Sequence, residues 1–190
     1  MTSSLLNDKI NTANKSEREY QVELKEALLK RRSVRKYKDI PVTDEQIEEL
    51  LHAAMSGPSA CNKTPWEFYV VKNGPTLDSV KKSSLFSRFN SSLVIVVCGN
   101  TERALPEPLT EYWIQDCSAA IENVLLRAVD LGLGAVWCGA YPQKRVGCNL
   151  KECLGLPEHH IPLAIVHLGY PDEEPEARDQ YDPDRIHYIG

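Results

Sequence analysis

The chain has 190 residues, 42% of them hydrophobic, and its 27 acidic side chains outnumber its 22 lysines and arginines, which gives a net charge of −5. This size and composition predict one compact domain with a proper core, and the negative charge argues against sequence-independent binding to nucleic acid. The longest apolar run, residues 93–98, is far shorter than the roughly 20 residues of a membrane-spanning helix, and the N-terminus lacks a signal-type segment, so a cytoplasmic protein is expected.

The N-terminal part of the chain is expected to consist of a flexible arm and a first helix. Residues 1–16 are polar, and we expect them to form the arm ahead of a single domain over residues 17–190. Ser16 followed three residues on by Glu19 fits a capping box, and apolar residues then recur at helical spacing. This predicts a helix that ends where the composition becomes strongly basic.

The basic segment, residues 30–38, concentrates six cationic side chains in nine residues of an otherwise acidic chain. Like charges repel one another unless water screens them or an anion lies among them. Arginine presents a rigid fork of donors to a phosphate, and Ser33 can add a neutral hydrogen bond to the same group. A phosphate site and a solvated basic helix end are both consistent with these residues, because cations also suit the negative end of a helix dipole.

The middle of the chain alternates helices and strands. Thr43 is predicted to cap a second helix whose apolar face runs from Ile47 to Met55 and which stops at Gly57. After a loop of small and polar residues, the β-branched and aromatic residues 66–71 indicate a strand. The unbroken apolar run at residues 93–98 indicates a second strand that is covered on both faces.

A long helix is predicted at about residues 110–131, with a continuous apolar stripe along it. That stripe is consistent with a buried core helix and equally with a subunit interface. Residues 135–138 indicate a third strand, residues 144–154 another helix, and residues 161–169 a fourth strand.

Four strands interleaved with helices predict a three-layer α+β sandwich. The tail from Tyr170 is rich in Pro, Asp and Glu, so it is expected to lie over the surface or over another subunit. The six cysteines include no C-x-x-C pair, and we interpret them as reduced thiols rather than ligands of zinc or an iron-sulfur cluster. No metal site is therefore predicted.

Three motifs, in order along the chain, resemble those of the nitroreductase family, a group of FMN-dependent oxidoreductases that work as homodimers. Residues 31–35 read R-R-S-V-R and are similar to the family's R-R-S-x-R flavin motif. Residues 58–66 read P-S-A-C-N-K-T-P-W and are similar to its P-S-x-x-N-x-Q-P-W loop. Residues 132–139 read G-L-G-A-V-W-C-G and are similar to its G-L-G-x-x-W-x-G turn. The resemblance spans residues 23–188, nearly the whole chain.

The resemblance implies a four-stranded, mainly antiparallel sheet flanked by helices in an intertwined homodimer, with FMN sites at the subunit interface. It assigns the flavin phosphate and ribityl chain to one group of residues: Arg31, Arg32, Ser33, Arg35 and Arg178. It assigns a loop that reaches the flavin ring from the neighbouring subunit to Pro58, Ser59, Ala60 and Asn62. It places Cys138, Gly139 and Ala140 at the opposite ring face, where a backbone N–H can donate to the flavin N5 atom and Cys138 is expected to serve packing.

Two residues depart from the family pattern. Gln180 stands where a second C-terminal cation is common, and losing one charge-assisted hydrogen bond would cost roughly 1.5 to 3 kcal/mol of FMN binding. Thr64 stands where Gln is common in the loop at the flavin edge.

The resemblance implies hydride transfer from NADH or NADPH through flavin N5 to a nitroaromatic, a quinone or a similar acceptor, by a ping-pong mechanism. No catalytic side chain is predicted, because the flavin carries the chemistry. Two alternatives remain: a protein that stores or senses FMN with little turnover, and a regulatory dimer that has lost the cofactor. The sequence does not choose between NADH and NADPH.

Overall fold

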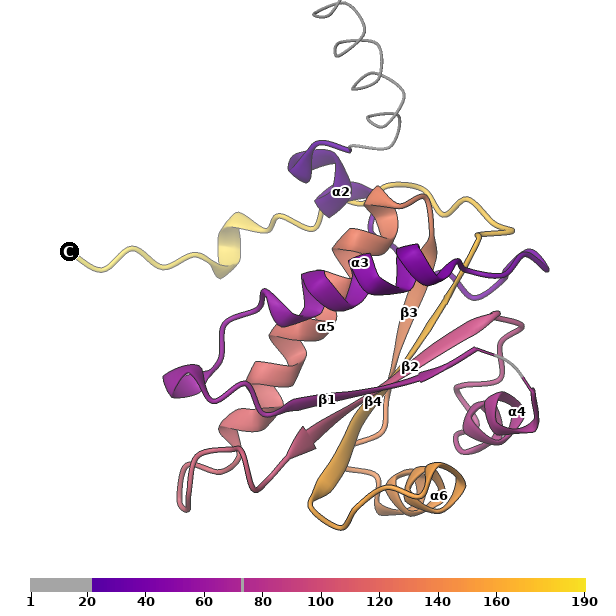
Figure 1. The fold of residues 1–190 in the computed structure, drawn as a ribbon. Coiled ribbons are helices and arrows are strands. Elements are labelled where there is room, and N and C mark those ends of the chain that lie inside the picture. Colours follow the sequence, from indigo (N-terminus) through magenta and orange to yellow (C-terminus); the bar gives the residue numbers. More distant parts are fainter. Residues whose placement is uncertain (1–21, 73) are drawn as a thin grey trace, which may run out of the picture.

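The computed structural model describes residues 22–72 and 74–190 (Figure 1). The expected N-terminal arm, residues 1–16, and the capping box of Ser16 and Glu19 lie outside the described residues. None of the described helices is both long enough and apolar enough to cross a membrane.

The centre of the fold is a sheet of four strands, as the sequence predicts. The strands are β1 (Trp66–Val71), β2 (Leu93–Asn100), β3 (Gly134–Gly139) and β4 (His160–Gly169). They lie in the order β1-β2-β4-β3, and every neighbouring pair is antiparallel. This order makes β3 an edge strand, so one side of its backbone is open to other groups.

Helices cover both faces of this sheet. Figure 1 shows α3 (Asp44–Met55) and α5 (Tyr112–Asp130) on one face, and α4 (Gly74–Lys82) and α6 (Lys144–Leu154) on the other. The central strand β2 contributes side chains to the cores on both faces of the sheet, because successive side chains of a strand point to opposite faces. Its residues 93, 95 and 97 join the core with α3 and α5, and its residues 94, 96 and 98 join the core with α4 and α6. The predicted three-layer α+β sandwich is confirmed.

The apolar stripe of α5 belongs to the core of its own chain. Cys117, Ile121, Val124 and Ala128 are fully buried, and they pack among residues of α3 and the sheet. Of the two explanations that the sequence allows for this stripe, the core helix is therefore the one observed.

Local signals in the sequence set several helix ends. Thr43 and Gln46 form a reciprocal capping box at the start of α3. Gly155 ends α6 in the left-handed conformation, with φ of 62°.

The first described helix, α2 (Leu24–Lys30), is less buried than its sequence suggests. Only Ala27 is buried, while Leu24 and Leu28 are 67% and 53% exposed. The predicted helix before the basic segment is observed, but its leucines are exposed because α2 lies at the rim of the molecule beside the end of α5 (Figure 1). Their exposure leaves an apolar surface there.

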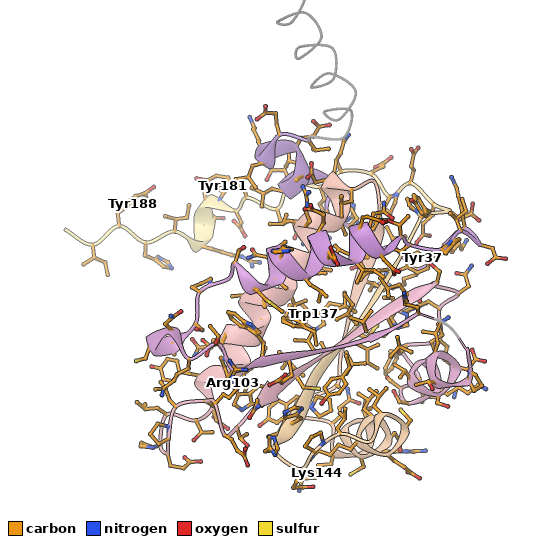
Figure 2. All side chains as sticks on the ribbon, viewed as in Figure 1. Tyr37, Arg103, Trp137, Lys144, Tyr181 and Tyr188 are labelled. Carbon is orange, nitrogen blue, oxygen red and sulfur yellow. The ribbon has the colours of Figure 1, made fainter. Side chains whose placement is uncertain are left out.

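The C-terminal tail runs along the basic segment and then leaves the body of the molecule (Figure 1). Lys38 N–H donates to Tyr170 O at 2.8 Å, Asp172 N–H donates to Lys36 O at 2.9 Å, and Arg178 N–H donates to Leu29 O at 3.1 Å. Beyond these bonds the chain is exposed, and Figure 2 shows Tyr188 well away from the sheet.

Candidate functional site

Two apolar side chains anchor the basic segment to the sheet. Val34 and Tyr37 are buried, and Val34 N–H donates to Ala135 O at 3.0 Å along the open edge of β3. Val34 lies over Gly134 and Tyr37 lies over Gly169, and these two glycines are partners in the β3–β4 ladder. The segment is therefore held flat on the sheet edge, with its cationic side chains on the outside.

The exposed side of the basic segment lines a cavity of about 490 Å³ together with the tail. All five residues that the resemblance assigns to the flavin phosphate and ribityl chain line it together: Arg31, Arg32, Ser33, Arg35 and Arg178. Asp179, Gln180 and Tyr181 line it from the tail, and Figure 2 shows Tyr181 beyond the edge of the sheet. We call this space the arginine cavity.

Positive charge in the arginine cavity is only partly neutralised. Arg31 Nε lies 3.1 Å from Glu122 Oε1, and Arg32 donates to the backbone oxygen of Glu176. Within the described part of the chain, Arg32, Arg35 and Arg178 form no ion pair. Their guanidinium groups remain available to an anion, and forked donors of this kind match a phosphate.

Glu173 steadies the backbone beneath these arginines. Its Oε1 atom accepts from Arg35 N–H at 2.6 Å and from Lys36 N–H at 3.2 Å. These backbone hydrogen bonds, the one from Arg35 first, lower the pKa of the Glu173 carboxyl. Glu173 thus fixes main chain and does not pair with the Arg35 guanidinium, whose Nη1 donates to Ser33 O at 3.4 Å.

Gln180 contacts the cation that precedes it in the tail. With the amide oriented so that both groups are satisfied, its oxygen accepts from Arg178 Nε and Nη2, each at 3.2 Å. Gln180, which stands where the family commonly has a second cation, therefore accepts hydrogen bonds from the first cation, Arg178.

The turn after β3 presents one backbone donor at the open sheet edge. Ala140 is fully buried and its N–H donates to Leu163 O at 2.8 Å, so this donor is already used. Because alternate residues of a strand point their N–H groups to opposite sides, the N–H of Gly139 points to the open edge, the side from which Val34 contacts Ala135. Of the two backbone donors that the sequence suggests, Gly139 is the available one.

Cys138 lies in the core between the sheet and the layer of α4 and α6, and its packing role at the flavin stays a prediction. Its thiol is buried and Sγ donates to Phe86 O at 3.2 Å. Burial raises the pKa of this thiol to about 11, while the charge of Arg35 lowers it.

The loop before β1 has an unusual backbone and a defined support. Cys61, Asn62 and Thr64 have φ of 49°, 53° and 44°, a region that residues other than glycine seldom adopt. Asp116 Oδ1 on α5 accepts from Ala60 N–H at 2.8 Å. Ser59 Oγ accepts from Thr64 N–H at 2.9 Å, which closes the loop on itself.

The arginine cavity of this chain contains none of the loop residues Pro58, Ser59, Ala60 and Asn62. Cys138, Gly139 and Ala140 also lie outside its lining. The residues assigned to the flavin phosphate thus line one cavity, and the loop residues assigned to the flavin ring lie outside it.

Comparison with known proteins identifies the family. The family model described as "Nitroreductase family" matches residues 28–87 and 80–170. The chain belongs to the nitroreductase family. This confirms the assignment made from the three sequence motifs.

Individual nitroreductase-family proteins are similar over most of their length. A protein of Archaeoglobus fulgidus, provisionally named NADH dehydrogenase/NAD(P)H nitroreductase, is 44% identical over 162 residues, which is 83% of this chain and 92% of that protein. A solved structure from Parabacteroides distasonis with the same provisional name has a TM-score of 0.83 at 38% identity, covering 90% of this chain and 99% of that one. An FMN-dependent nitroreductase structure from Clostridium difficile has a TM-score of 0.79 at 30% identity, covering 86% and 98%.

The sequence did not reveal every residue that shapes this nitroreductase site. Val34, Glu173 and Asp116 position the basic segment and the loop. Val34 occupies the variable position of the R-R-S-V-R motif, and Glu173 and Asp116 lie outside the three motifs. The acidic tail opposite a basic segment was the one available signal for Glu173, because complementary charges attract. Asp116 gave a weaker signal, as a charged residue beside the apolar stripe of α5.

Proposed function

We propose that this protein is an FMN-dependent oxidoreductase that works as a homodimer. It takes hydride from NADH or NADPH and passes it to a nitroaromatic, a quinone or a similar acceptor by a ping-pong mechanism. The coarser part, an NAD(P)H-dependent oxidoreductase, rests on the family and on relatives whose names include NAD(P)H nitroreductase. The finer part rests on the geometry of the site.

The arginine cavity is the observation that carries the FMN assignment. Four arginines and one acidic residue, Asp179, line one space of about 490 Å³, and Arg32, Arg35 and Arg178 form no ion pair in the described part of the chain. Such an arrangement repels itself unless an anion occupies it, and a phosphate monoester matches its forked donors. The Ser33 hydroxyl adds a neutral donor to the same wall. These residues fit the phosphate end of FMN.

The residues around the turn fit the ring end of FMN. When bound, FMN supplies the hydride-accepting N5 atom and the two-electron chemistry that links donor and acceptor. Gly139 can donate its free N–H toward that atom, and its lack of a side chain lets a flat ring approach the strand. The arginines would hold the phosphate end and so orient the ring against the strand. No side chain of this chain is given a proton-transfer role.

The homodimer follows from the separation of the two half-sites. Arg31, Arg32, Ser33, Arg35 and Arg178 share a cavity, whereas the loop with Pro58, Ser59, Ala60 and Asn62 lies outside it. In the proposed dimer the loop of one subunit covers the flavin that the arginines of the other subunit hold. The exposed leucines of α2 and the extended tail supply apolar surface for such an interface.

The first test is an absorbance spectrum of the purified protein, followed by anaerobic addition of NADH or NADPH. Two visible flavin bands near one FMN per chain, bleached by a nicotinamide donor, are expected. The Arg32→Ala variant should lose FMN, whereas Lys72→Ala, which removes a surface cation paired with Asp44, should keep it. Unchanged flavin content in Arg32→Ala would overturn the site assignment. A flavin-loaded protein that turns over slowly with every acceptor would instead favour FMN storage or sensing.

A second test examines the shared site. A variant with Arg32→Ala and a variant with Asn62→Ala should each be impaired as homodimers. In a mixed dimer of the two, one site carries both changes and the other carries neither, so mixing after dissociation should recover activity. Activity that never exceeds the sum of the two variants would argue that each subunit holds a complete site.

A further inference from the structure

A second cationic cavity lies on the other side of Cys138, against the layer of α4 and α6. It encloses about 210 Å³, and three cations from separate segments line it. Lys82 ends α4, Arg88 lies in the connection to β2, and Arg145 lies in the first turn of α6. We call it the α6 cavity. Figure 2 shows Lys144, the neighbour of Arg145, at the surface far from Tyr181 and the arginine cavity.

The α6 cavity has no negative charge of its own. No Asp or Glu lines it, and in the described part of the chain none of Lys82, Arg88 and Arg145 forms an ion pair. In a chain with a net charge of −5, three unpaired cations around one small space are unusual. Their mutual repulsion is relieved when an anion binds among them.

Neutral donors complete the lining of the α6 cavity. Ser84 is 5% exposed; its Oγ accepts from Phe86 N–H, and its hydroxyl hydrogen has no acceptor among the described residues. Gln143 precedes α6 and its side chain makes no capping hydrogen bond, so the first N–H groups of the helix are open to a ligand. A buried hydroxyl and open backbone donors beside cations are the groups that bind a phosphate.

The wall of the cavity formed by residues 83–91 is fixed from below. His167 of β4 is fully buried, and its Nε2 and Nδ1 atoms hydrogen-bond Ser87 Oγ at 2.6 Å and Ser91 Oγ at 2.8 Å. Asn149 of α6 donates to Ser83 O at 3.1 Å. The segment is therefore held at both ends and presents its cations from a defined position.

The α6 cavity adjoins the proposed flavin ring position. Phe86 supplies part of its lining, and Phe86 O accepts from Cys138 Sγ, one residue from the free N–H of Gly139. On the other side, the basic segment that lines the arginine cavity contacts the same open edge of β3, where Val34 N–H donates to Ala135 O at 3.0 Å. Two cationic cavities thus adjoin the strand that ends at Gly139, and FMN has only one phosphate to fill them.

We propose that the α6 cavity binds a phosphate group of the nicotinamide donor. This inference rests on the proposed function, because the donor must reach the flavin beside Gly139. The phosphate belongs either to the pyrophosphate, which NADH and NADPH share, or to the 2′-phosphate, which only NADPH carries. The second source would make the protein selective for NADPH.

Kinetics with three donors separate these sources. Arg88→Gln and Arg145→Gln are compared with Lys151→Gln, which removes a cation from the same helix outside the cavity. We expect the two arginine variants to raise KM for NADPH about tenfold or more, with kcat little changed. Reduction by benzyl dihydronicotinamide, which has no phosphate, should be unaffected. An equal rise for NADH identifies the pyrophosphate, and a rise for NADPH alone identifies the 2′-phosphate.

A binding measurement tests the proposed phosphate site without relying on flavin reduction. Titration calorimetry of the dimer with ADP-ribose and with 2′-phosphorylated adenosine reports the phosphate site directly. At least one of them should bind the wild type and the Lys151→Gln variant alike, and bind Arg145→Gln about tenfold more weakly. Equal affinity in all variants, or unchanged KM values for both dinucleotides, would overturn the proposal. A wild type without flavin that still binds these compounds would overturn the proposed function and leave the phosphate site standing.

Discussion

Val34 lies directly over Gly134: a Cβ atom built on Gly134 would fall 2.7 Å from Val34 Cγ1. The same closeness recurs beside it, where a Cβ on Gly169 would fall 3.0 Å from Tyr37 Cδ1. Two bare backbone positions in neighbouring strands thus receive the two apolar side chains of a strongly basic segment. These contacts, together with the hydrogen bonds that Glu173 accepts from the backbone, place the arginines of the proposed phosphate site.

Gly134→Ala should therefore weaken FMN binding without touching any arginine. The added methyl group must displace Val34, and overpacking of this kind costs about 1 to 3 kcal/mol. Urea unfolding at fixed protein concentration should show the loss of stability, and flavin retention on dilution should fall with it. Gly147→Ala is the matched control, because nothing lies within 4 Å of its added Cβ and alanine in a helix gains about 0.5 to 1 kcal/mol over glycine. Equal flavin retention in both variants would contradict the positioning role of Gly134.

Gln180→Ala should lower FMN affinity although Gln180 carries no charge. Without the amide oxygen that accepts from its guanidinium, Arg178 gains freedom that phosphate binding must remove. The donor is a charged guanidinium, but Gln180 is exposed, so the loss should be worth at most about 1.5 kcal/mol and the FMN dissociation constant should rise about twofold to tenfold. Fluorescence titration of the flavin-free protein with FMN measures this. An unchanged constant would mean that Arg178 needs no support from Gln180.

Two substitutions at Asp116 should distinguish its hydrogen bond to the loop from the destabilising effect of its buried charge. Burial raises the pKa of its carboxyl, the main effect, although the Ala60 N–H that it accepts lowers it. The folded state thus keeps the proton to a higher pH than the unfolded chain, and ionisation costs stability as pH rises above about 3.9. Asp116→Asn retains an acceptor for Ala60 without the charge, so it should equal or exceed the wild type in stability at pH 7 and lose this advantage near pH 4. Asp116→Ala lacks the acceptor and should lose flavin, and urea unfolding across this pH range with flavin content tests both.

His167 should make the folded protein sensitive to acid. Burial, aided by the charge of Lys81, lowers the pKa of its imidazole to about 3, whereas an ordinary histidine titrates near 6.5. The unfolded chain therefore binds a proton that the folded chain does not, and stability falls as pH drops from about 6.5 toward 3. One proton contributes a slope of at most about 1.4 kcal/mol per pH unit.

The groups that face His167 are neutral apart from Lys81: Ser87 and Ser91 bond its two nitrogens, and Phe89 packs edge-on at 5.1 Å between ring centroids. A His167→Gln variant should be less stable at pH 7 and should show a shallower slope between pH 6.5 and 4. Urea unfolding at several pH values provides the measurement. A slope identical to that of the wild type would show that another group controls acid sensitivity.

Much of the fold was predictable because its signals are local. The four strands and the helices α3, α5 and α6 follow from apolar periodicity and from caps such as Thr43 and Gly155, which act within one turn of chain. The arginine motif was equally visible, because charge density needs no tertiary contact to be noticed. The exposure of Leu24 and Leu28 was not visible, since periodicity states which face is apolar but not whether anything covers it.

The sequence by itself determined the family, the sheet with its layers of helices, and the list of cations suited to a phosphate. Only the tertiary structure decided which of those groups remain available. It uses the N–H of Ala140 in a bond to Leu163 and leaves that of Gly139 at an open edge. It holds Arg178 against Gln180, and it gathers Lys82, Arg88 and Arg145 into a cavity that no motif marks. The reason is that the sequence states which donors a chain has. Which of them stay available to a ligand depends on the hydrogen bonds and ion pairs that they already form in the folded chain.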